Sequence, residues 1–216
     1  MVTNDNIDDV IRILKRAVRQ WPPAVMAHYA HDPFLTLIGC LLSLRTQDAT
    51  THAACERLFA LARTPEAMLR LRPSTIERAI YPVLYYRGKT AVIRGACRAL
   101  LERFGGRVPS TIDELVTIKG VGRKTANLVV TMAFGKPGIC VDTHVHRITN
   151  RWGYVRTKTP DETEEALRRI LPRRHWRGLN GLLVPFGQHQ CLPISPLCST
   201  CPLAGPCARI GVTHSR

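Results

Sequence analysis

The stretch IKGVGRKTA, residues 118–126, lies between two segments with helical patterns. Gly120 and Gly122 permit a turn too tight for side chains, with backbone N–H groups pointing outward at the start of the second helix. Such a turn binds a phosphate group without reading base sequence. A G-x-G pattern alone is more often a plain turn, but here Arg123 and Lys124 follow it directly. The helical flanks and the two cations therefore favour phosphate binding.

Lys124 falls in the first turn of the expected second helix, beside Arg123. A free lysine, with a pKa of about 10.4, is almost entirely protonated at pH 7. The positive end of a helix, a cationic neighbour and partial burial would each lower that pKa. A neutral amine is a nucleophile. The residues alone leave two interpretations equal, an amine nucleophile and a lysine that contacts phosphate.

The second motif, ICVDTHVHR at residues 139–147, places Asp142 after an apolar triplet and before a helical pattern. Its first interpretation is a helix N-cap, which stabilises a helix by about 1 kcal/mol. Its second is a catalytic carboxylate held at a helix start, facing the glycine turn across a cleft. The D-x-H-x-H spacing also suggests metal ligands. On a helix, however, Asp142 and His146 share a face while His144 points away, which disfavours a metal there.

A cluster of four cysteines near the C-terminus is the third motif. Its members are separated by six, two and five residues: Cys191, Cys198, Cys201 and Cys207. In an intracellular chain such a cluster indicates metal ligation rather than disulfides. Four thiolates on Pro-containing loops can hold one tetrahedral metal or one cubane cluster. Zinc folds usually use two C-x-x-C pairs, and here only Cys198–Cys201 has that spacing, so the cubane is favoured and zinc is the rival. The other four cysteines are expected to be small buried side chains: Cys40, Cys55, Cys97 and Cys140.

The charge of the chain indicates a polyanionic partner. Among 216 residues, 31 Lys and Arg against 16 Asp and Glu give a net charge of +15, and neutralising phosphates releases condensed counterions. The longest apolar stretch, residues 35–42, is far shorter than the roughly 18–20 residues of a membrane helix. The N-terminus lacks the basic start and apolar region of a signal peptide. We therefore expect no membrane association, and a cytoplasmic protein associated with the nucleoid.

The remaining pattern is helical, with no alternating strand pattern and no internal repeat. The first expected helix covers residues 7–18, behind the capping candidates Asn4 and Asp5. Two short helices are expected to begin at Thr64-Pro65-Glu66 and at Arg72-Pro73-Ser74. The other expected helices cover residues 33–44, 49–62, 89–104, 111–117, 123–134, 142–152, 160–171 and 176–188. The Gly/Pro break at residues 135–138 is the expected crossing between two lobes.

The three motifs together resemble endonuclease III, a family of helix-hairpin-helix base-excision DNA glycosylases with an iron–sulfur loop. The match rests on GVGRKTAN at residues 120–127, VDTHVHR at residues 141–147 and the 6-2-5 cysteine spacing, in the family's order and at about its distances. Similarity extends from about Val10 to the C-terminal cysteines.

The resemblance implies an all-α, bilobed helix-hairpin-helix DNA glycosylase fold. One lobe is a six-helix bundle at residues 26–136, with the helix-hairpin-helix at about 111–134. The other joins residues 1–25 to residues 137–216 and carries the cluster loop at 191–207. Duplex DNA would lie across the mouth of the cleft, with the damaged nucleotide flipped into it.

The resemblance also implies roles for individual residues in a monomeric enzyme. Lys124 is the implied catalytic nucleophile, Asp142 the catalytic aspartate, and the four clustered cysteines Cys191, Cys198, Cys201 and Cys207 the ligands of a [4Fe–4S] cluster. The implied DNA contacts are Arg45, Tyr85, Lys89, Gly120, Gly122, Arg123, His144 and Arg147. The partner is double-stranded DNA with damaged bases or abasic sites.

The implied activity is bifunctional. The enzyme would remove oxidised pyrimidines such as thymine glycol and then cleave 3′ to the abasic site by β-elimination through a lysine Schiff base. Two alternatives remain: a monofunctional mismatch DNA glycosylase, and a non-catalytic DNA-binding module with structural zinc.

Four positions depart from the family pattern. Arg45 replaces a glutamine that fills the gap left by the flipped base, and Tyr85 replaces a leucine wedge. These two bear on lesion and opposite-base preference. Lys119 replaces a proline before the first glycine, and Val116 stands where a carboxylate often supports the catalytic lysine. These two bear on the turnover rate.

Overall fold

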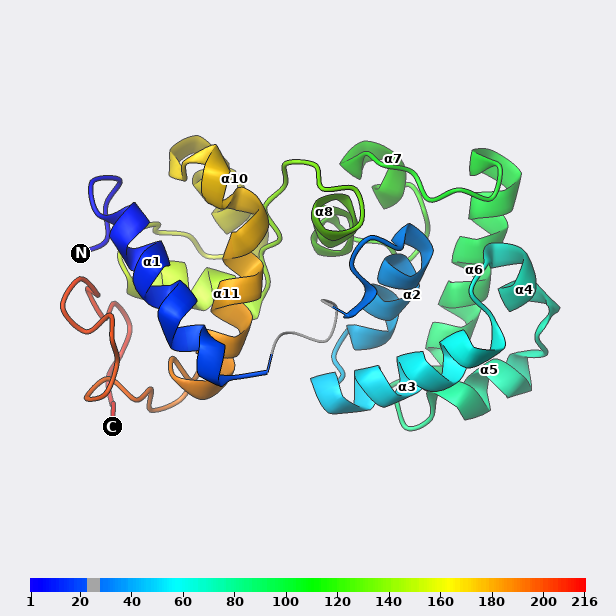
Figure 1. The fold of residues 1–216 in the computed structure, drawn as a ribbon, viewed down its shortest axis with the longest axis horizontal. Coiled ribbons are helices and arrows are strands. Elements are labelled where there is room, and N and C mark those ends of the chain that lie inside the picture. Colours follow the sequence, from blue (N-terminus) through cyan, green and yellow to red (C-terminus); the bar gives the residue numbers. More distant parts are fainter. Residues whose placement is uncertain (23–27) are drawn as a thin grey trace. The chain divides into compact units, whose positions relative to one another are not determined.

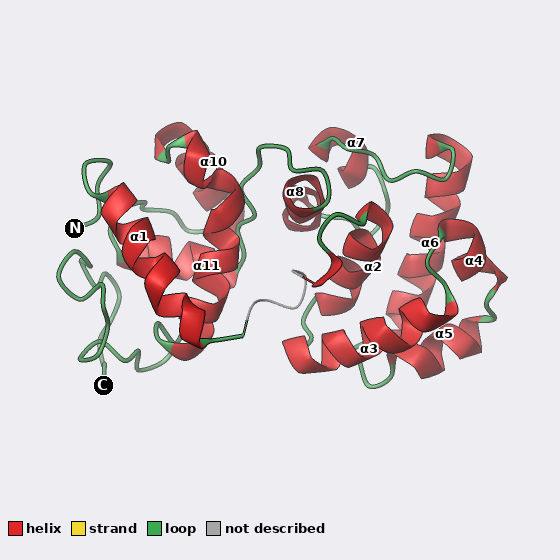
Figure 2. Cartoon of the chain, in the orientation of Figure 1, coloured by secondary structure: helices red, strands yellow, loops and turns green. Residues whose placement is uncertain are grey.

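The computed structural model describes residues 1–22 and 28–216, and in that part of the chain every regular element is a helix (Figure 2). The all-α class expected from the sequence is confirmed. Contacts group the described residues into two units, one of residues 1–22 with 137–216 and one of residues 28–136. Both chain termini belong to the first of these units (Figure 1). None of the described helices is both long and apolar enough to cross a bilayer.

The unit of residues 28–136 is built around a central apolar helix, α2. Its helices are α2 (Pro33–Ser43), α3 (Asp48–Leu61), α4 (Pro65–Arg70), α5 (Pro73–Ile80), α6 (Tyr86–Phe104), α7 (Ile112–Val116) and α8 (Arg123–Met132). Almost every residue of α2 is buried, and this helix packs against α3, α6 and α8. The buried side chains of all seven helices form one continuous core. This core holds the α7–α8 turn in place.

Proline and capping residues set most helix starts in this unit. Asp32 accepts a hydrogen bond from the Leu35 N–H at 2.9 Å, and Pro33 opens α2. A missing N–H costs nothing at the first helical position, which is why proline recurs there. Helix α6 instead begins at Tyr86, three residues before the expected start at Lys89. The intervening polar residues and Gly88 carry no apolar period that marks a helix.

The unit of residues 1–22 and 137–216 places its helices around a second core. These helices are α1 (Ile7–Ala17), the 3₁₀ turn η1 (Val18–Gln20), α9 (Thr143–Arg151), α10 (Pro160–Ile170), the 3₁₀ turn η3 (Arg173–His175) and α11 (Trp176–His189). Helix α11 packs against both α9 and α1, and the core includes Trp152 and Phe186. After α11, the described residues up to the C-terminus form turns and loops.

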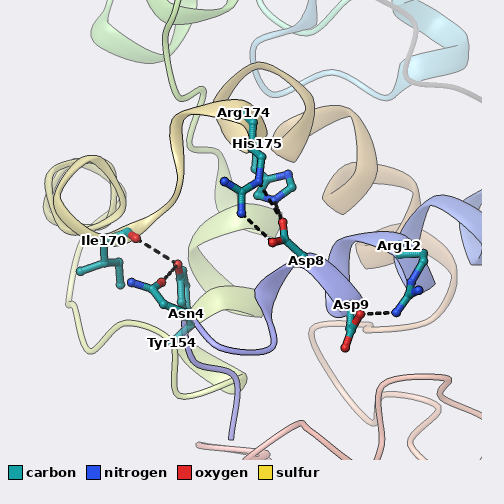
Figure 3. Close-up of polar contacts among 8 residues, drawn as sticks. All are labelled: Asn4, Asp8, Asp9, Arg12, Tyr154, Ile170, Arg174 and His175. Atoms are coloured by element: carbon teal, nitrogen blue, oxygen red, sulfur yellow. Dashed lines mark hydrogen bonds and ion pairs between the residues drawn. The ribbon is translucent and has the colours of Figure 1, made fainter.

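The start of α1 differs from the sequence expectation. Its N-cap is Asn6, not Asn4 or Asp5, and the Asn6 side chain makes no capping bond. Asn4 instead accepts a hydrogen bond from the hydroxyl of Tyr154 at 2.7 Å (Figure 3). The Asn4 side chain thus bonds to a residue far along the chain. Its position before a helical pattern suggests a helix cap and gives no sign of this contact.

An ion-pair cluster ties α1 to the second half of the chain. Asp8 accepts hydrogen bonds from Arg174 at 3.0 and 2.6 Å, and its other contact is with the His175 ring at 2.5 Å (Figure 3). The hydrogen bonds from Arg174 and His175 lower the pKa of Asp8 to about 2. The N-terminal helix is therefore held to η3 by charge as well as by its apolar face.

Candidate functional site

The turn between α7 and α8 requires glycine at position 120. Its closing hydrogen bond runs from the Val121 N–H to the Ile118 carbonyl at 2.9 Å. Gly120 has a φ of 92°, and a Cβ there would lie 2.5 Å from Cγ1 of Val92. Both the left-handed backbone and the close approach exclude other residues. The expected tight turn is confirmed at this glycine.

Gly122 serves a different purpose from the one expected. It has a φ of −89°, and a Cβ there would meet no atom within 4 Å, so the turn does not need a glycine at this position. Gly122 is the N-cap of α8 and offers no side chain to the first N–H groups of that helix. These groups have no intrahelical acceptor and carry partial positive charge. A helix start of this kind attracts an anion.

Lys124 and Arg123 are both exposed in the first turn of α8. The partial burial expected for Lys124 is therefore wrong, because only the following residues of α8 face the core. Cys40 of α2 is buried, and the charge of Lys124 acts on its thiol. Burial raises the pKa of the Cys40 thiol to about 12, with the Lys124 charge acting in the opposite sense. Lys124 is thus an exposed residue whose charge acts on a buried thiol of the neighbouring helix. Val116, at the position where the family often has a carboxylate that supports the lysine, lies on the neighbouring α7 and is 39% exposed.

Arg45 and Tyr85 form a contact between two loops of the same unit. The guanidinium carbon of Arg45 lies 5.9 Å from the centroid of the Tyr85 ring, a cation–π distance. Tyr85 is 64% exposed, and Arg45 is also exposed. Both have a φ of 57°. For residues other than glycine this left-handed conformation costs about 1–3 kcal/mol and is concentrated at ligand-binding sites.

Lys89 connects the two loops. Its ammonium donates to the carbonyls of Leu42 and Leu44, each at 2.6 Å, and to the Thr46 hydroxyl at 3.0 Å. Its backbone N–H donates to the carbonyl of Tyr85 at 2.9 Å. Burial lowers the pKa of Lys89 to about 8. All three ammonium hydrogens are directed at protein acceptors, so a direct contact of Lys89 with DNA stays a prediction.

Asp142 caps α9, as the first of its two interpretations predicts. Its Oδ1 accepts hydrogen bonds from the backbone N–H groups of His144 and Val145, both at 2.9 Å. Capping therefore engages one carboxylate oxygen and fixes the orientation of the other. The side chain is half-buried at the start of the helix.

Arg147 and His144 face α11 within the same unit. Arg147 donates to the carbonyls of Gly187 at 3.1 Å and Cys191 at 2.9 Å, and its guanidinium lies 3.2 Å from Nδ1 of His144. Position 187 requires glycine, because a Cβ there would lie 2.3 Å from that same Nδ1. Burial lowers the pKa of Arg147. The guanidinium of Arg147 is hydrogen-bonded to protein carbonyls. DNA contacts by Arg147 and His144 stay predictions.

The four clustered cysteines line one cavity between the end of α9, the end of α11 and the C-terminal loops. Its other lining residues are mainly apolar, including Trp152, Phe186 and Leu203. Burial raises the pKa of Cys201 to about 11, and the charges of the other three cysteines add to the effect. No group of three or more His, Cys, Asp or Glu side chains in residues 1–22 and 28–216 is arranged to hold a single metal ion. The four cysteines thus share one cavity and offer only sulfur as a ligand atom.

Sequence reasoning missed the residues that hold this cysteine loop. Gln190 is buried, and its side chain donates to the Leu197 carbonyl. Arg151, at the end of α9, is also buried and contacts the loop at three atoms. Both are ordinary polar residues in helical patterns, and only the fold brings them to the loop.

Comparisons with known proteins agree with this architecture. Residues 38–173 match the HhH-GPD superfamily of base excision DNA repair proteins. The chain is 46% identical to endonuclease III of Thermotoga maritima over 180 residues, which cover 83% of this chain and 84% of that protein. Two solved structures superpose over 97% of both chains. One is a trapped covalent intermediate of endonuclease III with DNA, at TM-score 0.84 and 35% identity. The other is a non-covalent endonuclease III–DNA complex, at TM-score 0.83 and 34% identity.

The helix-hairpin-helix glycosylase fold expected from the three motifs is thereby confirmed. The family match spans well over half of the chain, and the similarity to one relative extends over most of both lengths. The chain belongs to the endonuclease III family within the HhH-GPD superfamily of base excision DNA repair proteins.

Proposed function

We propose that this protein is a bifunctional DNA glycosylase and abasic-site lyase. It excises oxidised pyrimidines such as thymine glycol from duplex DNA and then cleaves the strand 3′ to the abasic site. The observation that carries the proposal is the position of Lys124, an exposed amine in the first turn of α8, directly after an uncapped glycine turn. A solved relative that forms a covalent intermediate with DNA supports a nucleophile in this fold.

DNA binding begins at the α7–α8 turn. A backbone phosphate accepts hydrogen bonds from the first N–H groups of α8, and the exposed Arg123 adds a charge. This contact is independent of base sequence and fixes the strand relative to Lys124. The net charge of +15 adds a long-range attraction that weakens with salt.

Excision starts when the neutral amine of Lys124 attacks C1′ of the flipped nucleotide. The C1′–N bond breaks, and the oxidised base leaves with its electron pair and takes up a proton. The Asp142 carboxylate, oriented by its bonds to α9, stabilises the positive charge that develops on the sugar and accepts a proton from the attacking amine. The nitrogen lone pair of Lys124 then forms a C1′=N double bond while the C1′–O4′ bond breaks and O4′ takes up a proton. The opened deoxyribose is thereby joined to Lys124 as a protonated Schiff base.

Strand cleavage follows from the acidity that the protonated Schiff base gives to the C2′ hydrogens. Loss of a C2′ proton sends its electron pair into a new C2′–C3′ double bond, and the C3′–O bond breaks. The 3′ phosphate leaves with the electrons of that bond. Hydrolysis of the Schiff base releases Lys124.

Arg45 and Tyr85 are proposed to occupy the space that the flipped nucleotide leaves. The exposed Tyr85 ring offers a face on which a neighbouring base stacks. The Arg45 guanidinium donates to the unpaired base opposite the lesion, and guanine, with its O6 and N7 acceptors, fits an arginine best. We therefore propose that lesions opposite guanine are preferred.

The cysteine cavity is proposed to hold a [4Fe–4S] cluster ligated by Cys191, Cys198, Cys201 and Cys207. Four cysteines lining one mainly apolar cavity supply an all-sulfur ligand set. Their 6-2-5 spacing, with a single C-x-x-C pair, fits a cubane better than a zinc ion, whose sites usually use two such pairs. When bound, the cluster supplies a one-electron redox centre and a fixed anchor for four thiolates. The protein's own contribution is to fix the loop around it.

A strand-cleavage panel tests the proposal. Duplexes carry thymine glycol, other oxidised pyrimidines, an abasic site or a mismatch, and the variants are Lys124→Ala and Asp142→Asn. We expect cleavage of oxidised pyrimidine and abasic-site duplexes, loss with Lys124→Ala, and a strong reduction with Asp142→Asn. Base release without strand cleavage contradicts the lyase and supports a monofunctional enzyme. A colourless, zinc-containing protein whose DNA binding is unchanged in both variants supports a non-catalytic module.

A further inference from the structure

Arg151 is a buried cation at the last position of α9. It is 8% exposed, and its guanidinium reaches across to the loop that follows α11. It donates to the carbonyls of Leu192 at 2.6 Å and Pro193 at 2.7 Å. It also donates to Sγ of Cys191 at 3.3 Å. A single side chain therefore fixes both the sulfur of one cluster cysteine and the two residues after it.

The backbone of Arg151 contacts a second cysteine of the set. Its carbonyl accepts from the Ile210 N–H at 3.0 Å and lies 3.6 Å from Sγ of Cys207. Arg151 thus touches both the first and the last of the four cysteines.

Arg151 belongs to none of the ion pairs found among the described residues. Those pairs join other arginines and histidines to Asp or Glu side chains. A buried guanidinium without an opposite charge is unfavourable, since burial removes its hydration. The guanidinium of Arg151 instead contacts the Cys191 sulfur, a group that can carry negative charge. The guanidinium therefore points to a negatively charged occupant of the cysteine cavity.

We propose that Arg151 is a positioning residue for the cluster, acting as its charge partner and as an N–H···S donor to Cys191. This rests on the [4Fe–4S] cluster of the proposed function. Hydrogen bonds to ligand sulfurs and nearby charge are among the factors that set the potential of an iron–sulfur centre. A positive charge and an N–H···S bond favour the more electron-rich state. Arg151 therefore raises the reduction potential and slows the loss of the cluster.

The test compares Arg151→Met and Arg151→Lys with a matched control, Arg209→Met. Methionine keeps much of the apolar stem without charge or donors, and lysine keeps the charge without the planar fork. Arg209 lines the same cavity but is exposed. The measurements are iron and sulfide per chain after anaerobic reconstitution, the rate of cluster loss in air, and the midpoint potential of the loaded protein.

We expect Arg151→Met to lose the cluster at least several-fold faster than wild type and to have a more negative midpoint potential. Arg151→Lys is expected to fall between them, and Arg209→Met to match wild type closely. Faster loss with an unchanged potential in both Arg151 variants would mean that Arg151 only packs the loop, and overturns the proposal. An equal shift in Arg209→Met overturns it too, because general charge then explains the effect.

Failure of the proposed function gives a different result. Wild-type protein that takes up zinc and no iron under reconstitution contradicts the cluster itself. Wild-type protein that holds iron and cleaves lesion-containing DNA, with the same potential in every variant, contradicts only the role of Arg151.

Discussion

The guanidinium carbon of Arg45 lies 5.9 Å from the centre of the Tyr85 ring, and both residues have a backbone φ of 57°. Each belongs to a different loop, and Lys89 donates to the carbonyl of Leu44, next to Arg45, and to the carbonyl of Tyr85. Strained conformations persist only where the surrounding structure holds them. This pair is therefore a rigid surface feature.

A double-mutant cycle tests whether the pair acts together on DNA. Arg45→Gln and Tyr85→Leu introduce the residues that the family commonly has at these positions. We expect each to lower kcat/KM for thymine glycol opposite guanine by about tenfold, equivalent to about 1.4 kcal/mol. The coupling between them should be about 0.5–1 kcal/mol, as for an exposed cation–π pair. Fully additive losses, or the same losses opposite adenine, would contradict a joint role in reading the unpaired base.

Lys89→Met should loosen the loop that carries Arg45. The substitution leaves the acceptors of Leu42, Leu44 and Thr46 without their donor, at a cost of about 1–3 kcal/mol in unfolding free energy. Because the folded pKa of Lys89 is about 8 and its unfolded value is about 10.4, the unfolded state binds more protons between these values. Lys89 therefore makes stability rise with pH across that window. Denaturant titrations at pH 7 and pH 10 should show that Lys89→Met loses this rise, whereas Arg87→Met, exposed on the same helix, keeps it.

The two glycines of the α7–α8 turn should respond in opposite ways. Gly120→Ala meets Val92 and a φ of 92°, so we expect a loss of about 1–3 kcal/mol in unfolding free energy. Gly122→Ala meets no atom within 4 Å, so its stability loss should stay below about 1 kcal/mol. Its affinity for DNA should nevertheless fall severalfold, because the new methyl group lies where a phosphate approaches α8. Unchanged affinity in Gly122→Ala would argue against a phosphate at this helix start.

Asp8→Asn should remove an acid-sensitive contact. The folded pKa of Asp8 is about 2, against an ordinary value of 3.8. The stabilisation by the Asp8 carboxylate is therefore fully present above about pH 4 and lost as the pH falls through 2. Unfolding monitored by circular dichroism should show wild type more stable than Asp8→Asn at pH 7 and the two converging near pH 2. The control, Asp9→Asn, affects only an exposed pair within α1. A difference that persists at pH 2 would exclude the carboxylate as its source.

Local patterns in the sequence predict most helices and the capping role of Asp142. Proline at the first helical position and a capping residue before it are local signals, so α2, α4 and α10 begin where the sequence indicates. Asp142 likewise caps α9. These features depend on neighbours within one helical turn.

Long-range contacts could not be read from the sequence. The ammonium of Lys89 is bound to a loop more than 40 residues away, and Arg151 is bound to a loop about 40 residues away. The exposure of Lys124 and the open space at Gly122 likewise depend on which face of α8 packs against α2. The residue types at these positions fit several roles, and only the packing of distant helices selects one.

Trapping with borohydride tests the central claim most directly. Reduction converts a Schiff base between an enzyme and an abasic sugar into a stable amine, so the protein should migrate as a covalent adduct with a thymine glycol duplex. We predict an adduct with wild type, none with Lys124→Ala, and a peptide map that places the modification on Lys124. Arg123→Ala, next in the chain, should still form the adduct. An adduct that persists in Lys124→Ala, or no adduct with any oxidised pyrimidine or abasic site, would contradict Lys124 as the nucleophile.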